Sequence, residues 1–107
     1  MSLVVTMKMQ WQRAKTDLTK AQFEEDTAAR QIEKLTSQIN DVASAAGSSK
    51  DYKNNDIYKR LVAEQSAYEV RKESLDTEIS MLKEQVQSYK EALKEGIKEN
   101  TTWWCMS

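Results

Sequence analysis

The residues that could support catalysis or metal binding are few in this chain, and their spacing suits neither. The 107 residues include no His, and Cys105 is the single Cys. The absence of His removes the commonest general base and the usual partner of a nucleophilic Cys or Ser, and one Cys excludes a multi-cysteine metal site. The run Glu24-Glu25-Asp26 gathers three carboxylates, but consecutive side chains fan out around a helix and do not converge on one ion. We expect no enzyme activity, no metal and no cofactor.

One further pattern resembles a functional motif and fails on inspection. The segment from Asp51 to Asp56 resembles the start of a calcium loop. Its third position is Lys53, its sixth is an Asp where Gly is needed, and its twelfth is Val62 where a bidentate Glu belongs. Two hypotheses remain for Cys105: it is an inert thiol in apolar surroundings, or it forms a crosslink between subunits.

Charge is balanced along the chain, which bears on its partners. Lys and Arg number 16 and Asp and Glu number 17, for a formal net charge of −1, with the signs interspersed. This pattern predicts no nucleic-acid partner. We also expect no small-molecule substrate. The apolar start, residues 3–7, is interrupted by Lys8 and is too short for a signal peptide or a membrane span. We therefore expect synthesis in the cytosol without a cleavable signal, and a cytoplasmic protein or one exported by a signal-independent route.

Apolar residues recur at alternating steps of three and four through the first half of the chain. Glu25 is the only polar residue in this series, which otherwise consists of Val4, Met7, Trp11, Ala14, Leu18, Ala21, Ala28, Ile32, Leu35, Ile39, Val42 and Ala46. An average step of 3.5 residues keeps one narrow stripe of a helix facing a partner helix. The pattern predicts a long helix over about residues 3–46.

The second half repeats this spacing after a polar break. Gly47 suits the left-handed position after a helix, and Asn54 or Asn55 can cap the next one; a capping box from Ser48 is the alternative start. The series then continues through Tyr58, Leu61, Gln65, Tyr68, Lys72, Leu75, Ile79, Leu82, Val86, Tyr89, Leu93, Gly96, Asn100 and Trp103. We predict a turn over about 47–55, a helix over about 56–99 and an apolar tail over 100–107.

Two matched helices joined by a short polar turn predict an all-α fold, an antiparallel two-helix coiled-coil hairpin that forms oligomers. The register depends on the turn. A wide loop centred near residue 52 pairs Ile32 with Lys72 and Glu25 with Ile79, whereas a tight turn at residues 47–49 pairs Glu25 with Lys72. Leaving a dry seam charge unpaired would cost about 3–5 kcal/mol, which favours the tight turn. If both charges reach water at the seam edge, that preference is small.

Surplus apolar residues gather where the two chain ends meet. All three Trp residues fall in this part of the sequence, and two helices cannot bury every face of each other. Large exposed apolar patches are typical of partner surfaces, so we predict self-association through Leu3, Val5, Met7, Trp11, Ile97, Trp103, Trp104 and Met106. In the alternative, the chain leaves the helix after Gly96 and its tail folds back over the open end as a cap.

The heptad seam with its turn at residues 47–56 resembles, over the whole chain, the helical-hairpin needle and stalk proteins of bacterial type III and flagellar export systems. The Pro-containing turn of needle subunits is missing here. Prefoldin-type chaperone subunits are similar in size and carry client-binding apolar helix tips, but they insert strands that residues 47–56 do not suggest. These resemblances imply a self-assembling structural subunit, an oligomer or filament of a secretion or surface apparatus. The alternative is a small chaperone or adaptor that binds a client helix through its Trp-rich end.

Overall fold

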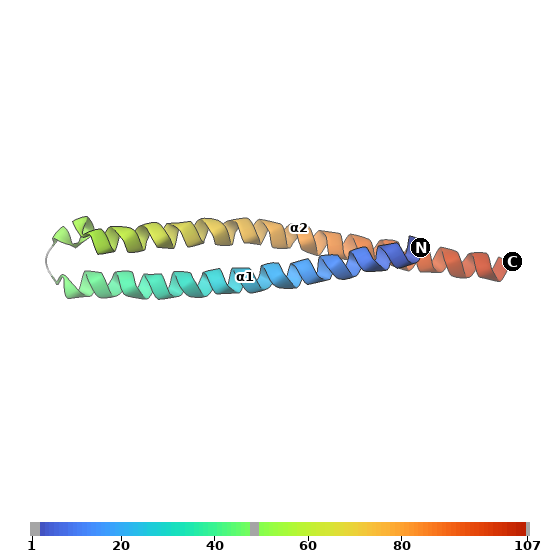
Figure 1. The fold of residues 1–107 in the computed structure, drawn as a ribbon, viewed down its shortest axis with the longest axis horizontal. Coiled ribbons are helices and arrows are strands. Elements are labelled where there is room, and N and C mark those ends of the chain that lie inside the picture. Colours follow the sequence, from blue (N-terminus) through green and yellow to red (C-terminus); the bar gives the residue numbers. More distant parts are fainter. Residues whose placement is uncertain (1–2, 48–49, 107) are drawn as a thin grey trace. The chain divides into compact units, whose positions relative to one another are not determined.

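Two long α-helices and a short linking 3-10 helix make up this protein. The computed structural model describes residues 3–47 and 50–106, with side chains described for 3–47 and 52–98. Helix α1 spans Leu3–Ala45, η1 spans Lys50–Asn54 and α2 spans Asp56–Met106. The two long helices run antiparallel and pack against each other (Figure 1). No strand occurs in the described ranges, so the predicted all-α hairpin is confirmed.

The turn is built from a left-handed glycine and a capped helix start. Gly47 has φ +61°, and its N–H donates to the Ser44 carbonyl at 3.2 Å, which closes the end of α1. At the start of α2, the Ile57 N–H donates to Asn55 Oδ1 at 2.7 Å, so Asn55 is the N-cap. The start expected from a Ser48 capping box is wrong, because residues 50–54 form η1 and α2 begins only at Asp56.

Helix α2 continues past the predicted end near residue 99. It runs as one helix to Met106, so the alternative in which the chain leaves the helix after Gly96 is wrong. The reason is tertiary packing: the α-carbon of Gly96 faces α1, where an added Cβ would lie 3.6 Å from Met7 Sδ and 3.8 Å from Val4 Cγ2. Contact with α1 holds a residue in helical conformation that would favour termination in an isolated helix.

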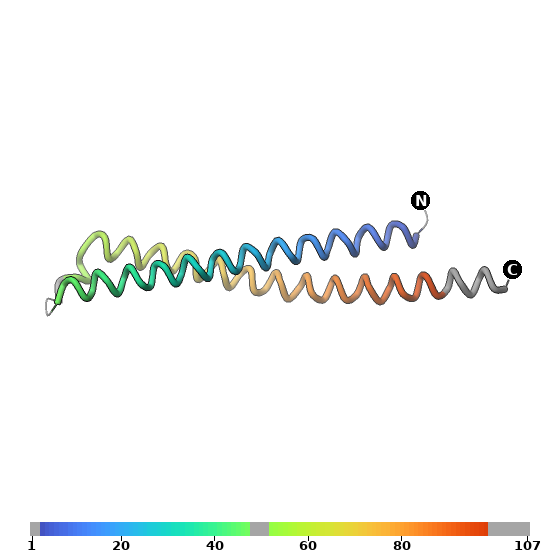
Figure 2. The backbone as a smooth tube through the Cα atoms, turned by 90° about the horizontal axis from the view of Figure 1, so that it is seen from below, coloured from blue at the N-terminus to red at the C-terminus, as the bar shows by residue number. Residues whose placement is uncertain are grey.

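The chain divides into two compact units. One unit combines Met1–Gln22 with Thr77–Ser107, and the other consists of Phe23–Asp76. In the first unit, Ala21, Ile79 and Leu82 form a buried cluster with Leu18 packed against it. Ala14 and Leu93 are also buried there. In the second unit the buried residues are Ala28, Leu35, Leu61 and Leu75. Both cores consist of seam residues alone, and Figure 2 traces the two helices that supply them.

The observed register lies between the two predicted ones. In the second unit, Gln65 Nε2 donates to Thr36 Oγ1 at 2.6 Å. The tight turn would have placed Thr36 opposite Leu61, and the wide loop would have placed it opposite Tyr68. The tight turn is wrong because η1 adds length to the link between the helices. The cost of burying an unpaired charge, which favoured the tight turn, does not arise, because no charged side chain is buried among the described residues.

Candidate self-association surface

The seam residues occupy the face where α1 and α2 meet. Each of the ten aliphatic residues predicted for it is buried or half-buried: Leu35, Leu61, Leu75, Ile79, Leu82 and Leu93 are buried, and Leu18, Ile32, Ile39 and Val86 are half-buried. Alternating steps of three and four keep these side chains on one stripe of each helix. Their apolar surface is therefore used inside the chain and is not offered to a partner.

Alanines on α1 make this seam narrow. Ala14, Ala21 and Ala28 recur every seventh residue and are 5%, 4% and 2% exposed. Small residues at a helix interface let the helix axes approach toward the lower end of the usual 8–10 Å range. A narrow contact of this kind covers only a thin stripe of each helix, so the outer faces stay in water.

The two seam charges reach the edge of the contact. Lys72 pairs with Asp76 on its own helix at 3.7 Å, and the side chain of Lys72 is 39% exposed. Glu25 is half-buried and makes a polar interaction of its own. Long charged side chains can cover apolar surface while their head groups remain in water. The seam edge thus accommodates both charges without a buried ion pair.

The structure divides the predicted self-association residues into three groups. Leu3, Val5 and Ile97 are exposed, at 73%, 46% and 50%. Met7 and Trp11 are half-buried, because their heptad positions turn them toward α2. The side chains of Trp103, Trp104 and Met106 lie outside the described residues, as does Cys105. The prediction that Met7 and Trp11 belong to an outward surface conflicts with this half-burial.

Trp11 carries a polar anomaly at this end of the seam. Its indole Nε1 is buried and has no hydrogen-bond partner, while Lys15 Nζ lies 4.4 Å from the centre of its ring. A buried donor without an acceptor costs about 1–3 kcal/mol, part of which a cation above the ring offsets. The indole of Trp11 therefore packs in the seam, and its unpaired N–H lowers the stability of the fold.

Outward apolar residues also occur where the heptad analysis did not look. Phe23, Val70 and Met81 are 71%, 67% and 57% exposed, and Met9 and Ile57 are 55% and 53% exposed. Counting only positions at steps of three and four finds the seam and ignores the opposite face. Phe23 and Met9, fourteen residues apart, share one heptad position on the outside of α1, and this spacing is readable from the sequence.

An open depression lies on the described surface of α2. Met81, Glu84, Gln85 and Ser88 line an open depression, and all four belong to α2, so no second element covers it. Within the described residues, no cluster of three or more metal-ligating side chains occurs. No described helix is long and apolar enough to cross a bilayer.

The arrangement offers exposed apolar side chains on its outer helix faces. Exposed aromatic and aliphatic side chains of α1 and α2 surround a seam that is already satisfied within the chain. Comparisons with protein-family models, with curated proteins and with solved structures found no match to this chain.

Proposed function

We propose that this protein is a structural subunit that assembles with copies of itself through the outer faces of its two helices. The observation that supports the proposal is the exposure of large apolar side chains on both helices. Eight are at least 46% exposed: Leu3, Val5, Met9, Phe23, Ile57, Val70, Met81 and Ile97. Single exposed apolar residues are ordinary, but a set of this size on a chain of 107 residues favours a contact surface.

The total exposed area supports the same proposal. The chain exposes 8314 Å². A compact monomer of this mass would expose about 6,100 Å², so this chain leaves roughly 2,200 Å² more in water. Stable interfaces bury about 1,600 Å² in total, which the excess on each copy can supply. A second copy is a suitable occupant because the net charge of −1 gives little repulsion between copies.

The larger assembly in which such a subunit would act is a stalk or filament, in keeping with the architectural resemblance to needle and stalk proteins. The heptad residues pack within each hairpin, so contacts between outer faces would set the number of copies in the assembly. The competing function is a monomeric adaptor that presents the same outer residues to a client helix. The two functions differ in what the isolated protein does as its concentration rises.

Sedimentation velocity over a range from low micromolar to high micromolar protein tests the proposal. Assembly predicts a sedimentation coefficient that rises with concentration and a mass above that of the 12.3 kDa chain. A chain that stays monomeric at the highest concentration would contradict the proposal and favour the adaptor. Far-ultraviolet circular dichroism on the same samples checks that the chain is helical at each concentration.

A further inference from the structure

The part of α1 that belongs to the first compact unit carries its cations in two rows. Residues 3–22 hold four cations and one acid, Asp17. At about 100° of rotation per residue, every residue of this segment that lies about 100–120° from the buried Ala14 is a cation. These cations are exposed and form two pairs, Lys8 with Lys15 on one side and Arg13 with Lys20 on the other. Asp17 lies only about 60° from Ala14 and is thus nearer to the seam.

The surface between the two rows of cations is uncharged. It consists of the residues that lie at least about 140° from Ala14, which are Val5, Met9, Gln12, Thr16 and Thr19. Val5 and Met9 are 46% and 55% exposed. The hydroxyls of Thr16 and Thr19 donate to carbonyls of the preceding helical turn, each at 3.0 Å, so their methyl groups can enter apolar surroundings without an unpaired donor. We call these five residues and the four cations the basic outer face.

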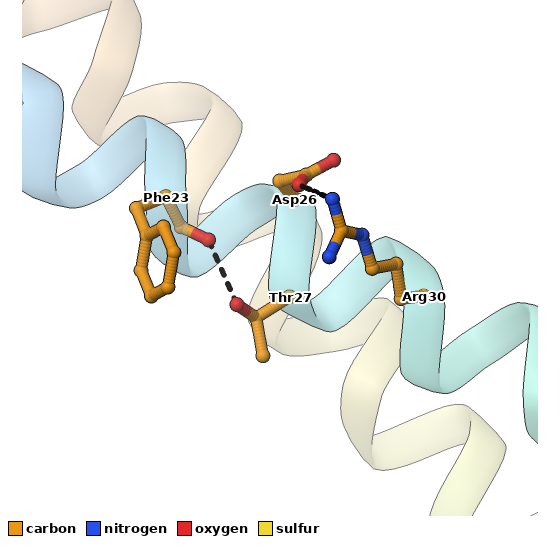
Figure 3. A network of polar contacts seen from close by, with 4 residues as sticks. All are labelled: Phe23, Asp26, Thr27 and Arg30. Atoms are coloured by element: carbon orange, nitrogen blue, oxygen red, sulfur yellow. Dashed lines mark hydrogen bonds and ion pairs between the residues drawn. The ribbon is translucent and has the colours of Figure 1, made fainter.

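The excess of positive charge is specific to this part of the chain. In the α2 segment of the same unit, residues 77–98, four lysines balance four glutamates. In the α1 segment of the other unit, residues 23–45, five acids outnumber two bases. There Asp26 and Arg30 form an ion pair at 2.9 Å (Figure 3). The positive charge of the first unit therefore comes from α1.

From this pattern we infer that the basic outer face binds the surface of a lipid bilayer that contains anionic phospholipids. Lysine and arginine have long carbon chains, so cations on both sides of an uncharged strip can reach lipid phosphates while Val5 and Met9 enter the headgroup region. Each cation near an anionic surface strengthens binding about fivefold. The inference goes beyond the proposed self-assembly and does not depend on it, because Phe23 and Val70 lie in the other unit.

A basic face can also bind nucleic acid, and the uncharged strip distinguishes the two partners. Proteins hold nucleic acid through cations and polar groups on phosphates, and they stack unpaired bases on exposed aromatic rings. The aromatic residue of this segment is Trp11, which is half-buried toward the seam and has Lys15 Nζ 4.4 Å from the centre of its ring. Exposed aliphatic side chains between the cations therefore favour a lipid surface.

Sedimentation of the full chain with vesicles tests the inference. At low ionic strength we expect binding to vesicles of equal parts phosphatidylcholine and phosphatidylglycerol, and binding at least about tenfold weaker to phosphatidylcholine alone. Lys8→Gln with Lys20→Gln should weaken binding to the anionic vesicles about tenfold or more, because each row loses one cation. The matched control, Lys83→Gln with Lys94→Gln, removes the same charge from exposed positions of α2 in the same unit and should leave binding unchanged.

Met9→Ser tests the uncharged strip, with Met81→Ser, at a side chain 57% exposed on α2, as its control. We expect Met9→Ser to weaken vesicle binding about threefold or more and Met81→Ser to leave it unchanged. Circular dichroism shows whether each variant retains its helices. No binding to anionic vesicles, or equal effects of the two lysine pairs, would overturn the inference. Tighter binding to a DNA duplex than to vesicles, unaffected by Met9→Ser, would assign the face to nucleic acid and overturn it too.

Discussion

The two glycines illustrate how one residue type serves opposite purposes at different positions. Gly47 adopts φ +61°, a conformation that costs other residues about 1–2 kcal/mol, and it closes α1. Gly96 is helical and faces Met7 and Val4, with room for a methyl group at ordinary contact distance. Gly47 is therefore required by the backbone, whereas Gly96 weakens α2 without a steric need for it.

We expect Gly96→Ala to raise the free energy of unfolding by about 0.5–1 kcal/mol, because it removes the helix penalty of glycine and adds a contact with Met7. Gly47→Ala should lower it by about 1–2 kcal/mol, because alanine is strained at positive φ. Urea denaturation of both variants measures the difference. Equal effects, or effects of the same sign, would contradict this account of the two positions.

At the scale of the helices, spacing specified most of the fold. The 3-4 repeat and the polar break near Gly47 were enough to predict two antiparallel helices, because a single apolar stripe on each helix has one way to be buried. The register could not be predicted, since it depends on the length that η1 adds and on the Gln65 to Thr36 hydrogen bond. The end of α2 also differs from the prediction near residue 99, since the helix runs on to Met106.

The residues of the candidate surface were harder to predict from the sequence. Clustering in sequence near the chain ends grouped Trp11 with Leu3, although Trp11 is turned toward α2 and Leu3 toward water. Phe23 was overlooked because it falls between seam positions. Direction around the helix, not nearness to the terminus, separates the packed residues from the exposed ones.

The alanine stripe of α1 gives a prediction at this scale. Ala21→Leu should destabilise the hairpin by about 1–3 kcal/mol, because three further carbons must fit between Ile79 and Leu82 in a narrow seam. Ala67→Leu, on an exposed face of α2, is the matched control and should change stability by less than about 0.5 kcal/mol. Thermal unfolding followed by circular dichroism compares them. A harmless Ala21→Leu would mean that the helices are not held closely there.

For the molecule as a whole, the seam residues pack within one chain, whereas the outer faces of the two helices are exposed to solvent. The seam buries alanine and leucine with no buried charge among the described residues. The outer faces of α1 and α2 carry exposed apolar side chains, with Phe23 and Val70 among them. The proposed assembly uses faces of the helices that the fold leaves in solvent, so we expect variants on the outer faces to alter association and leave helicity intact.

Replacing two large exposed apolar side chains outside the seam tests the central claim most directly. The measurement is the mass in solution, by sedimentation equilibrium, of a chain that carries Phe23→Ser and Val70→Ser, because these side chains are 71% and 67% exposed. The matched control carries Ala67→Ser and Ser74→Ala, at two exposed positions of α2. We predict that the unaltered chain and the control have masses above 12.3 kDa and that the Phe23→Ser, Val70→Ser chain shifts toward that mass; an unaltered chain that stays at 12.3 kDa, or equal masses for the variant and the control, would contradict the account.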